Sequence, residues 1–84
     1  MHTIPTLKRK IKSLPIQIEN AKKEREDYNE AIKNAIKEGD QYKAGRYSER
    51  VFRLSYLIGK WTTELDSYQW QLEIQTNRKK RAGR

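Results

Sequence analysis

Apolar residues recur every three and then four positions along almost all of the 84-residue chain, and few folds can use this spacing. The pattern is interrupted only at Gly39-Asp40, and it predicts two long helices that each bury one narrow stripe. Arg25 is the one charge in the stripes; we expect it to set the register while its guanidinium reaches out to an acid. The first stripe is Ile4, Leu7, Ile11, Leu14, Ile18, Ala21, Arg25, Tyr28, Ile32 and Ala35, and the second is Ala44, Tyr47, Val51, Leu54, Ile58, Trp61, Leu65, Tyr68, Leu72 and Gln75.

The two stripes have matching lengths on either side of a turn. Gly39 suits the left-handed conformation that ends a helix, and Asp40 suits the N-cap of the next one. Folding the chain there sets small residues opposite each other near the turn and larger ones further out: Ala35 with Ala44, Tyr28 with Val51, Ile18 with Trp61, Leu14 with Leu65, and Leu7 with Leu72. We therefore expect an all-α protein, an antiparallel and coiled-coil-like helical hairpin.

Pro15 interrupts the first arm, because proline lacks the N–H that a helix interior needs. We expect a short N-terminal helix kinked at Pro15; the spacing alone leaves open whether the proline kinks one helix or separates two. A disordered, flexible basic tail is expected over 78–84, so that the single helical-hairpin domain covers 1–77. The expected helices are about 4–13, about 15–38 and about 40–77.

The excess positive charge lies at the two ends of the chain. Residues 1–15 carry +4 without any acid, the last eleven residues carry +5, and the middle, 16–73, carries −1, which makes the net charge of +8. A hairpin returns its ends to the same place, so these segments would form a single positive pole that favours a polyanionic partner. The candidate nucleic-acid-binding residues are Lys8, Arg9, Lys10, Lys12, Arg78, Lys79, Lys80 and Arg81.

A second stripe on the last helix, away from the apolar one, mixes aromatic and basic residues. Such a surface can stack bases, but Tyr, Trp and Arg are also the usual anchors of protein interfaces, which we favour. Two helices bury only a thin core, so we expect this stripe to be covered by a homodimeric four-helix bundle or by the N-terminal helix folding back at Pro15. The candidate partner-binding residues are Phe52, Arg53, Tyr56, Lys60, Trp70 and Ile74.

Catalytic and metal chemistry have little support in this composition. The chain has no cysteine and a single histidine, His2, and it contains no glycine-rich phosphate loop. The acids Glu24, Glu26, Asp27 and Glu30 lie among the cations Lys22, Lys23 and Arg25, which is typical of ion pairs on a helix surface. We expect no enzyme activity, metal, cofactor or small-molecule substrate. No apolar run approaches the about 20 residues of a membrane span, and no signal peptide is expected.

These observations lead to two hypotheses about function. The first is a non-catalytic nucleic-acid-binding protein, or an accessory of a nucleic-acid complex, that uses the basic pole with low sequence specificity. The alternative is a small helical adaptor or inhibitor that docks its aromatic and basic helix face on a larger protein, for example one whose acidic groove normally holds nucleic acid. Membrane binding through the amphipathic residues 4–14 is a weaker third option. The absence of cysteine is compatible with a cytoplasmic location.

Overall fold

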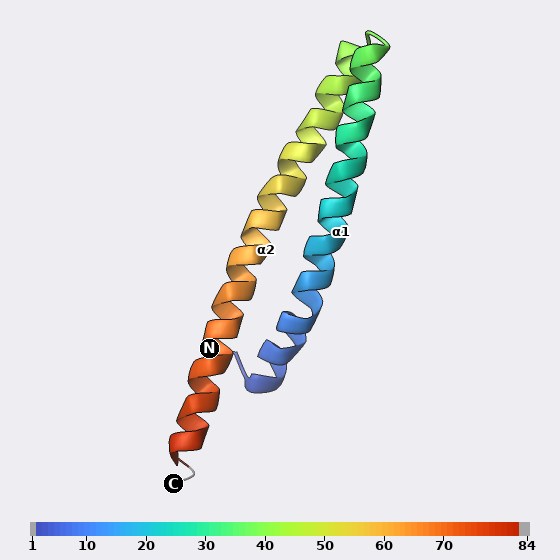
Figure 1. Ribbon diagram of the computed structural model, residues 1–84. Helices are drawn as coiled ribbons and strands as arrows, with labels where there is room; N and C mark the ends of the chain where they lie inside the picture. The colour runs from blue at the N-terminus through green and yellow to red at the C-terminus, as the bar shows by residue number, and fades with distance from the viewer. Residues whose placement is uncertain (1, 83–84) are drawn as a thin grey trace.

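Two antiparallel α-helices make up the computed structural model, which describes residues 2–82 (Figure 1). Helix α1 spans Ile4–Lys37 and helix α2 spans Gln41–Ala82. The helices pack along each other, and the molecule measures 69 × 15 × 13 Å. Since α2 alone is about 63 Å long at 1.5 Å per residue, it sets the long dimension. The predicted antiparallel hairpin is confirmed, and no strand occurs among residues 2–82.

The turn between the helices has the chemistry that its sequence predicts. Gly39 has φ +78°, the left-handed conformation that favours glycine. The N–H of Gly39 donates to the carbonyl of Ile36 at 3.1 Å and the N–H of Asp40 to that of Ala35 at 2.9 Å, which is a Schellman motif. Asp40 then caps α2, because its Oδ1 accepts the N–H of Lys43 at 3.0 Å.

The two predicted stripes form the interface between the helices. All of their positions are buried or half-buried. Among the residues whose burial is described, the largest fully buried side chain is Leu7, and the buried Ala35 and Ala44 flank the turn. At mid-length the core consists of buried Ile18, Ala21 and Ile58, with Leu54, Trp61 and Leu65 packed against them. Few side chains are wholly enclosed, so the core is as thin as two helices allow.

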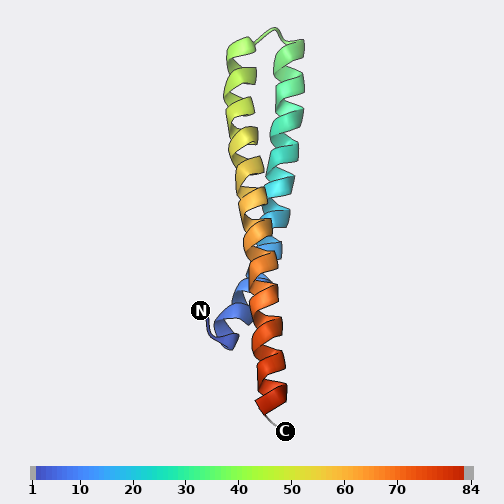
Figure 2. The ribbon, with the colours of Figure 1, turned by 90° about the vertical axis from the view of Figure 1, so that its left-hand side faces the viewer.

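Helix α1 continues through Pro15 instead of ending at residue 13 and starting again. The N-terminal part of α1, coloured blue, changes direction and crosses α2 in Figure 2. The proline therefore lies within one bent helix: the predicted kink at Pro15 is confirmed, and of the two possibilities left open by the spacing, the structure has one kinked helix. Pro15 removes only the hydrogen bond to the carbonyl of Ile11, whereas Leu7 and Leu14 on either side of that carbonyl are buried.

Helix α2 ends at Ala82, beyond the expected boundary at residue 77. The predicted tail 78–84 therefore continues α2 as far as Ala82; residues 83–84 lie outside the described part of the chain. The residues Arg-Lys-Lys-Arg-Ala are good helix formers, and cations at a helix C-terminus interact favourably with the helix dipole. These two effects explain why the basic composition extends the helix here.

Candidate nucleic-acid and partner interfaces

The N-terminus is held against the last turns of α2. The side-chain amide of Gln75 donates to the carbonyl oxygen of His2 at 2.9 Å. The His2 ring meets Tyr68 edge-on, with ring centroids 5.3 Å apart and an angle of 82° between the planes. Position 78 follows Gln75 by about 5 Å of helix rise. The start of α1 and the basic end of α2 are therefore neighbours.

The first basic cluster is displayed on the solvent side of α1. Lys8, Arg9, Lys10 and Lys12 are all exposed. On the opposite side of the same turns, Leu7 is 0% and Leu14 is 4% exposed. The apolar residues of this amphipathic segment are therefore used in packing between the helices, and only its cations are free to meet a partner.

The second basic cluster occupies the last turns of α2. The backbone of positions 78–81 is helical. Figure 1 shows this end of α2 at the open end of the hairpin, where it extends past the start of α1. The topology thus brings both predicted basic clusters to one end of the molecule; we call these eight residues the basic pole.

The aromatic side chains predicted to bind a partner are among the most exposed apolar groups of α2. The exposed fractions are 79% for Phe52, 66% for Tyr56 and 62% for Trp70, and Tyr42 is 74% exposed. Since the N-terminal helix leaves them uncovered, the expectation that it folds back over them is wrong. Among the other predicted partner-binding residues, Arg53 and Lys60 are exposed and Ile74 is half-buried. We call this surface the outer face of α2.

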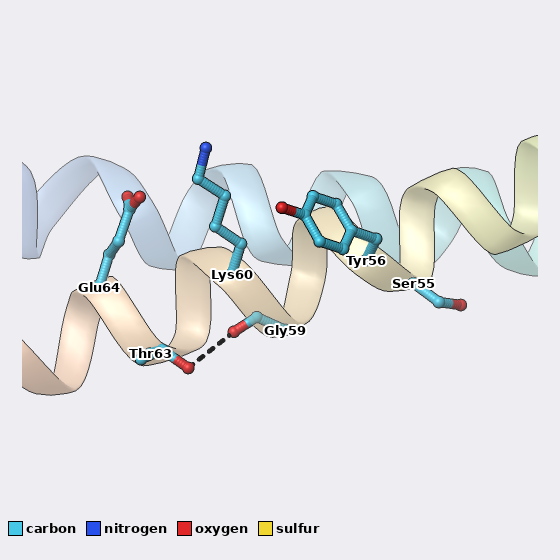
Figure 3. A pocket seen from close by; sticks show the side chains of 6 residues that line it. All are labelled: Ser55, Tyr56, Gly59, Lys60, Thr63 and Glu64. Atoms are coloured by element: carbon cyan, nitrogen blue, oxygen red, sulfur yellow. Dashed lines mark hydrogen bonds between the residues drawn. The ribbon is translucent and has the colours of Figure 1, made fainter.

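A shallow hollow lies in the middle of the outer face, where a glycine replaces a side chain. Its volume is about 640 Å³, and Figure 3 shows Tyr56, Lys60 and Glu64 along one side of it, with Gly59 and Thr63 along the other. The Thr63 hydroxyl donates to the carbonyl of Gly59 at 3.0 Å. A Cβ added at Gly59 would meet no atom within 4 Å, so this point of the face is open to an approaching surface.

Arg50 is a cross-helix residue that the sequence analysis missed. Its Nη1 donates to the Tyr28 hydroxyl at 2.9 Å, and its guanidinium lies 5.5 Å from the centre of the Tyr28 ring. The hydrogen bond to Tyr28 raises the pKa of Arg50 above its ordinary value, so it remains a permanent cation. Arg50 follows Arg46 by four positions, so both lie on one basic flank of α2. This spacing was the only feature of the sequence that could have pointed to Arg50.

Arg25 finds a hydroxyl instead of the acid that was expected. Its Nη1 donates to Ser55 Oγ at 3.3 Å across the interface, and the residue is half-buried. Arg25 bonds to a hydroxyl because Ser55 is the polar residue that faces it on α2, whereas the neighbouring stripe positions, Leu54 and Ile58, are apolar. Within residues 2–82, no group of three or more His, Asp or Glu side chains is arranged to hold a metal ion.

No helix in the described part of the chain is long and apolar enough to cross a bilayer. Comparison with known proteins found no family model, no curated protein and no solved structure that matches this chain. The chain's own residues offer two surfaces for a functional role, the basic pole and the outer face of α2.

Proposed function

We propose that this protein is a non-catalytic nucleic-acid-binding protein that contacts phosphates through its basic pole. The observation that supports this most is the return of both basic segments, +4 over residues 1–15 and +4 over positions 78–81, to one end of an otherwise almost neutral hairpin. The His2–Gln75 contact brings the start of α1 to within about one helical turn of position 78. Both clusters lie at this end of the hairpin, where one stretch of phosphate backbone can contact both.

The expected binding mode is electrostatic and has little sequence specificity. Lysine and arginine contacts to phosphate release counterions but read no bases. The buried Leu7 and Leu14 argue against the membrane option, since the apolar side of this segment is not free to enter lipid.

A salt titration of fluorescence anisotropy with a labelled duplex tests the proposal. The slope of log affinity against log salt is about −0.9 for each phosphate neutralised. Changing Arg78, Lys79, Lys80 and Arg81 to Gln should make the slope less steep, reducing its magnitude by about 3 to 4. The matched control changes Lys22, Lys23, Lys33 and Lys37 to Gln, which removes the same charge from the helix body. Equal loss in both variants, or no binding of wild type at low salt, would contradict the proposal.

A second candidate function is suggested by the exposure of Phe52, Tyr56 and Trp70. A larger protein could take this face while an acidic groove meets the basic pole, as in an adaptor or inhibitor. That function predicts that Trp70→Ala abolishes capture of a partner while the helix content, measured by circular dichroism, is unchanged. A variant that still captures the same partner would exclude it.

A further inference from the structure

Before the basic pole begins at position 78, the charges of α2 are segregated along its length. Residues 41–53 carry four cations and one anion, a net charge of +3, and residues 54–77 carry one cation and three anions, a net charge of −2. A helix that is basic in one half and acidic in the other attracts a copy of itself only when the two run antiparallel. In a parallel pair, like charges would face each other along the whole contact.

The outer face also has the spacing of a helix-packing stripe. Its residues again follow a three-and-four pattern, which keeps them on one side of α2 opposite the stripe that α1 covers. Tyr42 lies at one end of the face, Trp70 and Ile74 lie at the other, and the Gly59 hollow lies between them. The central stripe of the face is Tyr42, Arg46, Glu49, Arg53, Tyr56, Lys60, Thr63, Ser67, Trp70 and Ile74, and Phe52 and Gly59 lie along one flank of it.

We propose that a second copy of this chain docks on the outer face, with α2 packed antiparallel against α2 and a two-fold axis between Leu57 and Gly59. The product is a four-helix bundle in which the two α1 helices lie outside. The assembly does not depend on nucleic-acid binding, because the basic pole lies outside the contact.

Charge fixes the register of the two copies. Arg50 and Glu64 lie fourteen positions apart, two whole heptads, so they share one flank of α2. In an antiparallel pair centred near Leu57, Arg50 of each copy faces Glu64 of the other, and symmetry makes this contact twice. The Arg50 guanidinium remains available to Glu64 of the second copy. It has five N–H donors, and only its Nη1 donates to the Tyr28 hydroxyl.

The same register pairs aromatic rings with cations along the stripe. Arg46 faces Trp70 of the second copy and Lys60 faces Tyr56, which are both cation–π combinations. Tyr42, which is 74% exposed in the single chain, faces Ile74 of the second copy. No like-charged pair is placed in contact by this register.

Gly59 permits the close approach that the register requires. It lies beside the axis, so the two copies of Gly59 come near each other on one flank of the contact. The space over its Cα is empty to 4 Å, and the hollow of about 640 Å³ around it can take a side chain from the other copy. Figure 3 shows that Tyr56 and Lys60 stand clear of this floor and leave it accessible.

The exposed side-chain area of the outer face is of the order that a stable dimer buries. An aromatic side chain buries about 150–250 Å² when it is enclosed. Tyr42, Phe52, Tyr56 and Trp70 are 62–79% exposed, so they offer about 400–700 Å² per chain. The aliphatic parts of the arginines and of Lys60 add to this, toward the about 800 Å² per partner of a standard interface.

The mixed charge of the face disfavours nucleic acid as its occupant. A phosphate backbone lying along α2 would be attracted by residues 41–53 but repelled by Glu64, Asp66 and Glu73 in the other half. An anionic membrane would meet the same repulsion. A second copy is the occupant that turns both halves of the charge pattern into attraction.

Charge-swap variants test the dimer by sedimentation equilibrium. The wild type should have twice the mass of the 10.1 kDa chain at micromolar concentration. Arg50→Glu and Glu64→Arg should each weaken dimerisation by about tenfold or more, and the double variant R50E/E64R should recover it because the pair is exchanged across the axis. A wild type that is monomeric at several hundred micromolar, or a double variant no better than the singles, would overturn the proposal.

Cysteine cross-linking tests the direction independently of these charges, in a chain without native cysteine. Gly59→Cys lies next to its own copy across the axis and should form a disulfide-linked dimer under mild oxidation. Ser67→Cys is the matched control, since an antiparallel pair separates its two copies whereas a parallel pair joins them. Rapid cross-linking of Ser67→Cys without that of Gly59→Cys would exclude the antiparallel arrangement.

Discussion

Replacing Leu7 by alanine should release the N-terminal part of α1 while leaving the rest of the hairpin folded. Leu7 is 0% exposed, and it is the largest fully buried side chain of the described residues. Removing a buried leucine side chain costs about 2–5 kcal/mol. The exposed surroundings can close over the space that is left, so we expect the lower end of this range, about 2–3 kcal/mol.

The effect should be local because of Pro15. The helix has no N–H at this position to bind the carbonyl of Ile11, so residues 4–14 are joined to the rest of α1 by one hydrogen bond fewer. A loss of 2–3 kcal/mol corresponds to opening that is about 30–150-fold more frequent. The four cations of this segment would lose their fixed arrangement at the same time.

Native-state amide hydrogen exchange measures this opening residue by residue. Protection of the amides at residues 8–14 should fall by the whole of this about 30–150-fold factor, and protection within residues 21–35 should fall much less. Ile16→Ala is the matched control, because Ile16 is 59% exposed and should cost under about 0.5 kcal/mol. A uniform loss of protection along α1, or equal effects of both substitutions, would refute the claim that Pro15 marks a boundary of local unfolding.

Two further predictions concern the turn, and thermal unfolding followed by circular dichroism measures both. Gly39→Ala should destabilise the hairpin by about 1–2 kcal/mol, because φ is +78° there, whereas Gly45→Ala in α2 should stabilise it by about 0.5–1 kcal/mol; equal changes of the two would contradict the backbone argument. Asp40→Ala removes the acceptor of the Lys43 N–H and should cost about 1 kcal/mol, and Asp40→Asn should restore most of it.

The hairpin could be predicted from sequence because each of its determinants is local or periodic. Three-and-four spacing decides which side of each helix is buried, and the dipeptide Gly39-Asp40 contains both the left-handed residue and the cap. The residues at which the helices bend and end were harder to predict from the sequence. Pro15 has an unfavourable local effect that the burial of Leu7 and Leu14 outweighs, and that burial depends on α2.

The interfaces could be predicted as surfaces but not as contacts. Net charge located the basic pole, because two helices of matching length must bring their ends together. The Arg50–Tyr28 hydrogen bond and the Arg25–Ser55 hydrogen bond join residues on different helices. Their formation depends on side-chain rotamers and on the rotation of each helix about its axis, and a periodic pattern determines neither to the accuracy of a hydrogen bond.

Antiparallel dimerisation would give the basic pole a consequence that a single hairpin lacks. With the axis near Gly59, position 78 of each copy lies about 28 Å from the centre, so the C-terminal clusters of the two poles lie about 55–60 Å apart at opposite ends of the bundle. Such a particle can hold two nucleic-acid segments at once. Energy transfer between donor-labelled and acceptor-labelled duplexes should therefore rise on addition of wild type.

The two charge-reversal variants separate bridging from simple attraction. Arg50→Glu lowers the net charge of the chain by two and Glu64→Arg raises it by two, yet both oppose dimerisation. If bridging requires the dimer, both variants should lose energy transfer while each still binds a single duplex, and R50E/E64R should regain it. If net charge alone gathers the duplexes, Glu64→Arg should bridge better than wild type, and the link between the outer face and the poles would be wrong.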